Sequence, residues 1–414
     1  MTDKTIKTDE ADQADKADGA GQAAETGGAD ARPAPPPYSV CPAPGDAAAP
    51  TTPGGPATDP TRAEPDATGP ARAELLGRLR RTYRARSRRV TLTAVVLGLL
   101  LAGLLVASVL LGGLRRIEPG DVLPAALGLR DGVADYTIHR IRVPRALAAL
   151  LAGALFGLSG ALYQRVVRNP LATPDIVGIS AGASAGATTV LVLLPALPLG
   201  TPLAAVAGAF LLVGAIHALS WRGGVDTYRL VLVGIGLSAV CSAYTNYLFT
   251  LAEEHTLAAM MRWTIGSVNG ADWAGVTTLA WGLAVCGAGT ALLSRRLDCL
   301  ALGDEFATGL GTPVGLTRTT ALLLGAAGAA LATSVVGPVG FVSLISGPIA
   351  VRLAGPSRAV ALAVPVGAVI VLGADVLAQH APLVSPVPTG VLTALLGAPY
   401  FVWLLLRRRQ EATP

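Results

Sequence analysis

Long apolar segments separated by short polar joints follow one another from about residue 90 to residue 406. Most of them approach the roughly 20 residues that a helix needs to cross a hydrocarbon core. The ten segments run approximately over residues 90–114, 146–163, 177–197, 203–220, 230–252, 274–293, 319–337, 339–351, 359–378 and 389–406. The segment 339–351 is short and interrupted by glycine, so we expect a partial span there. The pattern predicts an all-α, polytopic membrane protein with about ten transmembrane helices.

The first 75 residues have a different composition. Residues 1–70 carry 12 acidic against 5 basic side chains and few large apolar ones, and they lack the apolar region of a signal peptide. Such a segment cannot bury enough surface to offset the entropy of ordering it. We therefore predict a disordered, acidic, Ala/Pro/Gly-rich cytoplasmic tail at 1–75 and a membrane domain at 76–410.

The positions of lysine exclude one function. Lys4, Lys7 and Lys16 are the only lysines, and all three lie in the tail. A P-loop needs a lysine after its glycines to reach the nucleotide phosphates, so the chain carries no ordinary ATPase site. The four cysteines and four histidines show no zinc-site or disulfide spacing. We expect a protein that is not an enzyme and binds no cofactor itself.

Arginines orient the predicted helices. Seven arginines between Arg78 and Arg89 precede the first apolar segment. Because positive charge concentrates in cytoplasmic loops, this places both termini in the cytoplasm of a multi-pass cell-membrane protein. The loop at 115–145 disagrees, since it carries six arginines and would lie outside. A basic exterior loop suggests a specific role there.

Three strings near the second segment carry a family resemblance: RVPR at 142–145, NPLATP at 169–174 and GISAGA at 178–183. Glycines four residues apart allow a second helix to approach closely in lipid. In order and spacing these strings resemble the permease subunits of ABC importers for ferric siderophores and cobalamin, the FecCD-type family. The strings TPDI at 173–176 and W-x-x-G-S-x-N-G-x-x-W at 263–273 are most similar to its ferric catecholate branch.

The resemblance covers residues 88–409 and implies a type II ABC importer permease. Such a subunit would form a homodimer or pair with a similar permease, and would join two ABC ATPases that bind ATP and Mg. An extracellular siderophore-binding protein would deliver a ferric siderophore, and no nucleic acid is involved. Cobalamin or haem is the alternative cargo. An ion-coupled secondary transporter and a non-transporting membrane protein are the rival classes.

Arg142 and Arg145 are two candidate residues in the predicted outer loop. By composition they could extend to lipid headgroups from the mouth of the second helix. The resemblance implies instead that they form an exposed pair that docks acidic residues of the binding protein.

The joint at 297–312 resembles the coupling helix that inserts into an ATPase subunit. An ordinary amphipathic surface helix is the alternative interpretation. The coupling residues that the resemblance implies are Leu302, Gly303, Asp304, Glu305, Ala307, Gly309, Leu310 and Gly311.

Small polar side chains in the fifth segment have two interpretations. They could hydrogen-bond between helices, or they could line a pathway between two protomers, as the resemblance implies. They are Ser238, Ser242, Tyr244, Thr245 and Asn246.

The remaining motif residues are expected to be architectural. Asn169, Pro170, Pro174 and Gly178 form a rigid turn in which Asn169 could satisfy free backbone groups. Asp375 is the one acid that we place inside a span, and we expect structural pairing rather than proton coupling. The sequence departs from the family pattern in three places, at Gly347-Pro348, at Gln379 and at Pro386.

Overall fold

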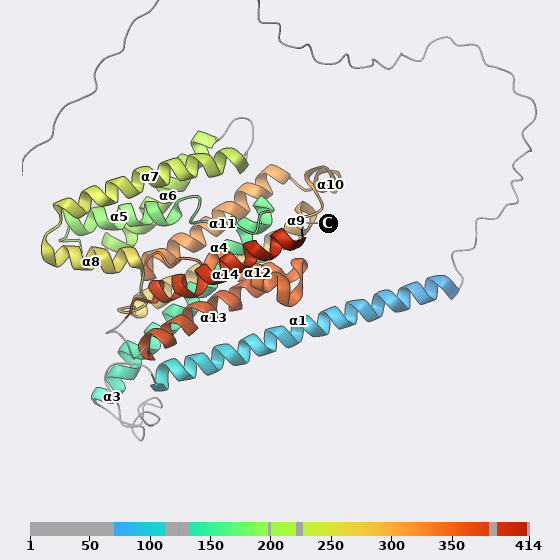
Figure 1. Ribbon diagram of the computed structural model, residues 1–414, viewed down its shortest axis with the longest axis horizontal. Helices are drawn as coiled ribbons and strands as arrows, with labels where there is room; N and C mark the ends of the chain where they lie inside the picture. Colours follow the sequence, from blue (N-terminus) through green and yellow to red (C-terminus); the bar gives the residue numbers. More distant parts are fainter. Residues whose placement is uncertain are drawn as a thin grey trace, which may run out of the picture. The chain divides into compact units, whose positions relative to one another are not determined.

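The computed structural model describes residues 70–111, 124, 132–197, 200–220, 227–380 and 387–411. Within these ranges every regular element is a helix (Figure 1). Seven helices are long and apolar enough to cross a membrane, and the three shorter apolar helices are Ile179–Leu193, Val342–Ala354 and Thr389–Leu404. The prediction of an all-α protein with about ten apolar helices is confirmed.

Helix α1 is longer than predicted. It spans Pro70–Leu111, whereas hydropathy placed its start near residue 90. At 1.5 Å per residue, the stretch before residue 90 extends the helix by about 30 Å. Residues 70–75, assigned above to the disordered tail, are therefore helical, and residues 1–69 lie outside the described residues.

Helix α4 (Val143–Val167) is the most enclosed element, with 17 buried residues. It packs against α13 (Ala359–His380), α11 (Val314–Val336), α12 (Val342–Ala354) and α9 (Trp273–Leu300). Gly153 lies against the backbone of Gly367, and Gly157 lies against the carbonyl of Ala363. A Cβ at either glycine would collide with main chain, so the small-residue pattern does bring two helix backbones together.

Helices α5 (Ile179–Leu193), α6 (Gly200–Ser220) and α7 (Thr227–Leu251) pack beside one another (Figure 1). Gly178, just before α5, lies against Leu212, which is eight residues before the end of α6. Helix α5 therefore starts partway along its neighbour. The NPLATP turn occupies the depth that a longer α5 would have filled.

Short helices and one further apolar helix complete the chain. The helices α3 and η1 lead into α4, α8 and α10 flank α9, η2 joins α12 to α13, and α14 follows α13. Their bounds are Val133–Tyr136 (α3), Thr137–Arg142 (η1), Glu254–Ile265 (α8), Asp304–Gly309 (α10), Pro356–Arg358 (η2) and Thr389–Glu411 (α14).

Candidate functional sites at the two ends of helix α4

At one end of α4 the carboxylate of Asp375 is fully enclosed, with none of its side chain exposed. Arg145, in the first turn of α4, donates from Nε to both carboxylate oxygens (3.2 and 3.1 Å) and from a terminal nitrogen to Oδ1 (2.8 Å). Gln379 Nε2 donates to Oδ2 (2.6 Å), and the Thr389 hydroxyl donates to Oδ1 (3.2 Å). We call these four residues the Asp375 cluster. A buried charge is stable only when it is paired and hydrogen-bonded, so the contacts favour structural pairing.

Gln379 is one of the three positions at which the sequence departs from the expected family pattern. In the Asp375 cluster a second cation is unnecessary, because Arg145 already balances the charge of Asp375. The amide supplies a neutral donor instead. Pro386, another departure, lies outside the described residues.

The prediction that Arg142 and Arg145 form an exposed docking pair is wrong. Arg142 is only 5% exposed and donates to the carbonyl oxygens of Val109 (3.0 Å) and Leu110 (3.2 Å). These carbonyls belong to the last turn of α1, where no intrahelical donor remains. The Arg145 side chain is 16% exposed and is engaged by Asp375. Arg142 therefore stabilises the end of α1, and Arg145 stabilises a buried acid.

The other end of α4 holds a second carboxylate, Asp304, in the first turn of α10. Arg168, which ends α4 in a left-handed conformation (φ 54°), donates to Asp304 Oδ1 at 2.6 Å and to the carbonyl of Leu300 at 2.7 Å. Arg318 of α11 donates to both oxygens of Asp304 at 3.2 and 3.0 Å. We call Arg168, Asp304 and Arg318 the Asp304 cluster. Through these contacts α10 is joined to the ends of α4, α9 and α11.

Electrostatics at the Asp304 cluster favour the ionised acid. Partial burial raises the pKa of Asp304, but the hydrogen bonds and charges of Arg318 and Arg168 outweigh it and lower the pKa below its usual range. The Asp304 side chain remains 48% exposed. Its charge is therefore neutralised at the surface of the bundle rather than inside it.

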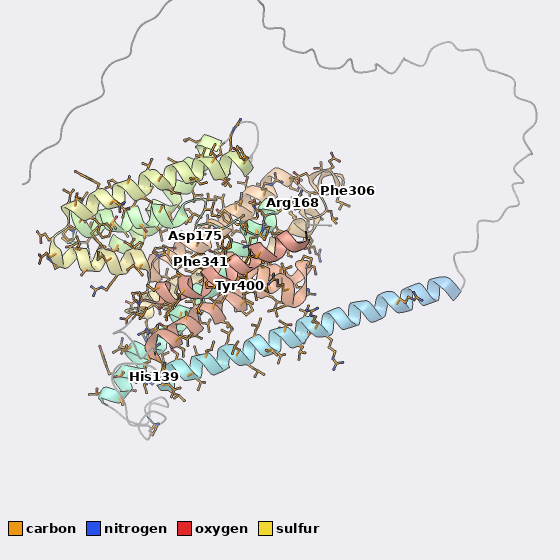
Figure 2. The ribbon with its side chains drawn as sticks, viewed as in Figure 1. His139, Arg168, Asp175, Phe306, Phe341 and Tyr400 are labelled. Carbon is orange, nitrogen blue, oxygen red and sulfur yellow. The ribbon has the colours of Figure 1, made fainter. Side chains whose placement is uncertain are left out.

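Around this cluster α10 forms a small projection with an apolar surface. Leu302, Phe306 and Leu310 are 63%, 71% and 63% exposed, while Ala307 is fully buried against the bundle. Gly303 (φ 117°) and Gly311 (φ 75°) reverse the chain before and after the helix, a conformation that favours glycine. Figure 2 shows Phe306 at the tip of the bundle with Arg168 nearby.

Sequence reasoning missed part of this site. Phe306 belongs to the amphipathic pattern but was not among the coupling residues, although its exposed ring is the largest apolar group on α10. Arg168 and Arg318 were not among the candidate residues. Asp304 is separated from Arg168 by 136 positions, so no local pattern could have indicated the pairing.

The five pathway candidates of α7 do not share one environment. Ser242, Tyr244 and Asn246 are exposed. Thr245 is only 5% exposed, and Ser238 donates to the carbonyl of Gly234 (2.6 Å) where Gly178 packs on it. Thr245 therefore faces the bundle and Ser238 is half-buried, and the role of the five residues in lining a pathway stays a prediction.

The NPLATP turn is architectural in the structure. Asn169 Oδ1 accepts the amide of Leu171 (3.0 Å), a local side-chain turn that fixes the backbone. Asp175 follows in the same turn, just before α5, and is half-buried. Its carboxylate accepts hydrogen bonds from Ser180 and from Ser343 of α12 (2.9 Å). The spacing Gly178-x-Ser180-x-Gly182 matches the GxSxG motif of hydrolase nucleophiles. In this chain, however, the Ser180 hydroxyl donates a hydrogen bond to Asp175.

The Gly347-Pro348 departure has a structural explanation. Pro348 lies inside α12 and has no N–H, so the carbonyl of Leu344 four residues earlier loses its helical partner. Gln164 of α4 replaces it, donating from Nε2 to Leu344 O at 3.0 Å and to Ser343 O at 3.3 Å. A Cβ at Gly347 would collide with the Gln164 amide. The polar side chain that completes the hydrogen bonds at Pro348 is therefore Gln164 of α4, and not a residue of α12 itself.

Comparison with known proteins identifies relatives over most of the chain. The FecCD transport family model matches residues 99–407. The ferric enterobactin transport system permease protein FepG of Escherichia coli (strain K12) is 34% identical over 296 residues, covering 71% of this chain and 90% of that protein. The vitamin B12 import system permease protein BtuC of Klebsiella pneumoniae is 38% identical over 316 residues, covering 72% and 89%.

A solved structure agrees with this result. An ABC transporter assigned to the metal-chelate type, in an inward-facing conformation, superimposes with a TM-score of 0.66 at 27% identity, covering 75% of this chain and 97% of that one. The resemblance inferred from the motif strings is confirmed. The chain belongs to the FecCD transport family, the permease subunits of ABC importers.

Proposed function

We propose that this permease moves a ferric siderophore across the cell membrane by alternating access, driven by ATPase subunits that bind its α10 projection. The observation that carries the proposal is the form of α10. Phe306 on α10 and Leu302 and Leu310 directly beside it present an exposed apolar surface. Arg168 at the end of α4 and Arg318 of α11 hold this helix through Asp304. A partner that moves α10 would therefore move the ends of α4 and α11 with it.

The similarity to the FepG permease supports a ferric siderophore as cargo, and so does the metal-chelate assignment of the solved neighbour. The similarity to BtuC supports cobalamin as the second candidate. ATP and Mg would bind the ATPase subunits, as expected for the permease subunit of an ABC importer.

Two other arginines would dock the binding protein. Arg140 and Arg262 are exposed, and they lie near the end of the bundle that holds the Asp375 cluster. Acidic residues on a binding protein would meet these two cations, whereas Arg142 and Arg145 are already engaged. The α10 end then faces the cytoplasm, as do both termini.

Pairing with a second permease would complete the pathway. Helix α7 is among the least buried of the candidate spans, with 17% of its apolar window enclosed. Ser242 and Asn246 lie on its exposed surface. A second permease, identical or similar, would cover this surface and place their polar groups along a shared passage.

The test measures uptake of radiolabelled ferric siderophores, cobalamin and haem in cells lacking this gene and in complemented cells. We expect the wild type to restore uptake of one ferric siderophore, and a Phe306→Ala/Leu310→Ala variant to restore little of it. Leu211→Ala, an exposed leucine on α6, is the matched control and should behave as wild type. If only cobalamin uptake were restored, the proposal of a siderophore cargo would be wrong. Full activity of the Phe306→Ala/Leu310→Ala variant would contradict the proposal that α10 binds the ATPase.

A further inference from the structure

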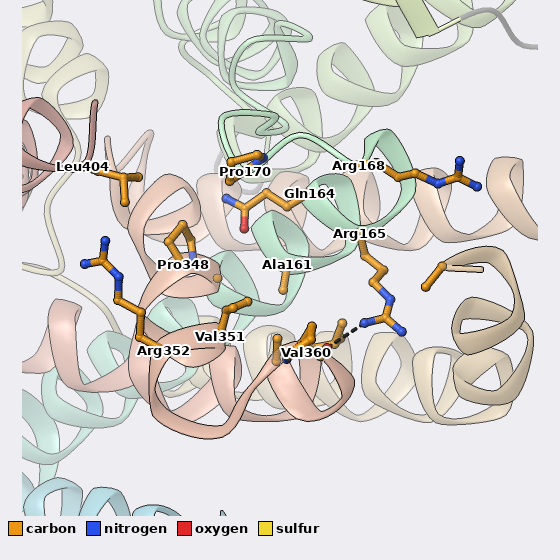
Figure 3. A pocket seen from close by; sticks show the side chains of 14 residues that line it. Ala161, Gln164, Arg165, Arg168, Pro170, Pro348, Val351, Arg352, Val360 and Leu404 are labelled. Atoms are coloured by element: carbon orange, nitrogen blue, oxygen red, sulfur yellow. Dashed lines mark hydrogen bonds between the residues drawn. The ribbon is translucent and has the colours of Figure 1, made fainter. Parts of the chain in front are cut away.

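A cavity of about 660 Å³ lies where α4, α12, α13 and α14 meet, near the α10 end of the bundle. Figure 3 shows Arg165, Arg168 and Arg352 at its edge, with Gln164 between them. The proposed coupling and docking residues, apart from Arg168, do not line it. Its chemistry therefore requires a separate explanation.

The cavity is positively charged. Arg165 is paired with Asp298 (2.6 Å), and Arg168 is paired with Asp304. Arg352 has no carboxylate partner among the described residues. Its guanidinium instead lies over the ring of Trp403, 4.4 Å from the centroid, and donates to the Tyr400 hydroxyl at 3.3 Å.

Arg165 is already engaged, because it donates to the carbonyl of Pro356 as well as to Asp298 (both 2.6 Å). Of the three arginines that line the cavity, Arg352 alone has no carboxylate partner among the described residues. Arg352 is therefore the cation that an anionic ligand would meet.

The rest of the lining is apolar. Ala161, Pro348, Val351, Val360 and Leu404 form continuous hydrocarbon surface beside the cations. Trp403 and Tyr400 stand next to Arg352, and this pairing of amphipathic aromatics with arginine is typical of the membrane–water interface. A ligand that fits must combine an anionic group with an apolar chain.

We propose that this cavity binds an anionic phospholipid, with the phosphate at Arg352 and an acyl chain along Val351, Val360 and Leu404. Basic pockets between transmembrane helices recognise lipid headgroups in this way. A free phosphate would leave most of the apolar wall in water, which is why the lipid is the better occupant.

The experiment is native mass spectrometry of the full-length chain released from detergent with one added lipid at a time. Dioleoyl-phosphatidylglycerol should be retained and dioleoyl-phosphatidylcholine largely lost. Arg352→Gln should weaken phosphatidylglycerol retention by about fivefold, the effect expected for one cation near a headgroup. Arg358→Gln, an exposed arginine of η2 outside the cavity, should leave it unchanged.

A second variant separates lipid binding from a folding defect. Val351 is 41% exposed and lines the cavity, so Val351→Trp should fill it while keeping every charge, and lipid retention should fall as well. Equal retention of the two lipids, or equal losses in Arg352→Gln and Arg358→Gln, would overturn the proposal. So would displacement of the lipid by millimolar inorganic phosphate, which would indicate a site for the free anion.

Discussion

Helix α4 holds an aspartate through an arginine at each of its ends, and the two pairs differ in exposure. Arg145 meets Asp375 where that carboxylate has no exposed surface, and Arg168 meets Asp304 where the carboxylate is 48% exposed. Both pairs consist of an arginine and an aspartate, but the first is enclosed by protein and the second is open to solvent. The comparison indicates a fixed end of the bundle and an end that is available to a partner.

The difference has an energetic meaning. Removing one member of a buried ion pair leaves an uncompensated charge and costs about 3–5 kcal/mol. An exposed pair contributes roughly 0–1 kcal/mol, because water solvates either charge alone. The Asp375 cluster should therefore determine the stability of the chain. The Asp304 cluster should determine how movement of α10 is passed to α4 and α11.

The largest effect is expected at the buried pair. Arg145→Gln leaves Asp375 charged and enclosed, so the free energy of unfolding should fall by about 3–5 kcal/mol. Unfolding of the purified chain in detergent, followed by circular dichroism, measures it. Arg145→Gln/Asp375→Asn should recover much of the loss, since no buried charge remains. Arg140→Gln is the control, and a loss equal to that of the control would show that the pair is not structural.

The exposed pair should give the opposite result. Asp304→Asn is expected to change the free energy of unfolding by no more than about 1 kcal/mol. Substrate uptake should nevertheless fall by about fivefold or more, the lower bound of typical coupling between sites. Uptake and ATPase activity are measured on the same assembled complex. If stability collapsed while uptake per folded molecule stayed normal, the two ends would not have separate roles.

A third prediction concerns the bend between the two ends. Gly347→Ala should displace the Gln164 amide and leave the carbonyl of Leu344 without a partner, at a cost of about 1–3 kcal/mol. Gly340→Ala has open space around its Cβ position and is the matched control. In a Gln164→Ala background, Gly347→Ala should cost much less. If Gly347→Ala cost as much stability in that background, its effect would not depend on Gln164.

How far the sequence predicts these two ends depends on how local each signal is. Hydropathy counts the apolar helices correctly because each is a continuous run. It missed the first part of α1, where the arginines between Arg78 and Arg89 are good helix formers but lower the hydropathy. The burial of Arg142 depends on the end of α1, and the role of Gln164 depends on Pro348, 184 positions later. Such contacts leave no periodic trace in the sequence.

The smallest effect is a pH dependence that should occur at the exposed pair. The arginines lower the pKa of Asp304 in the folded chain, so their stabilisation is fully present above the ordinary carboxyl pKa of about 4. It is lost as the pH falls through the lowered folded value. The difference in melting temperature between wild type and Asp304→Asn should therefore be constant from about pH 5 to pH 8 and shrink below about pH 4. A difference that changed near pH 7 would mean that another group, and not Asp304, titrates in the cluster.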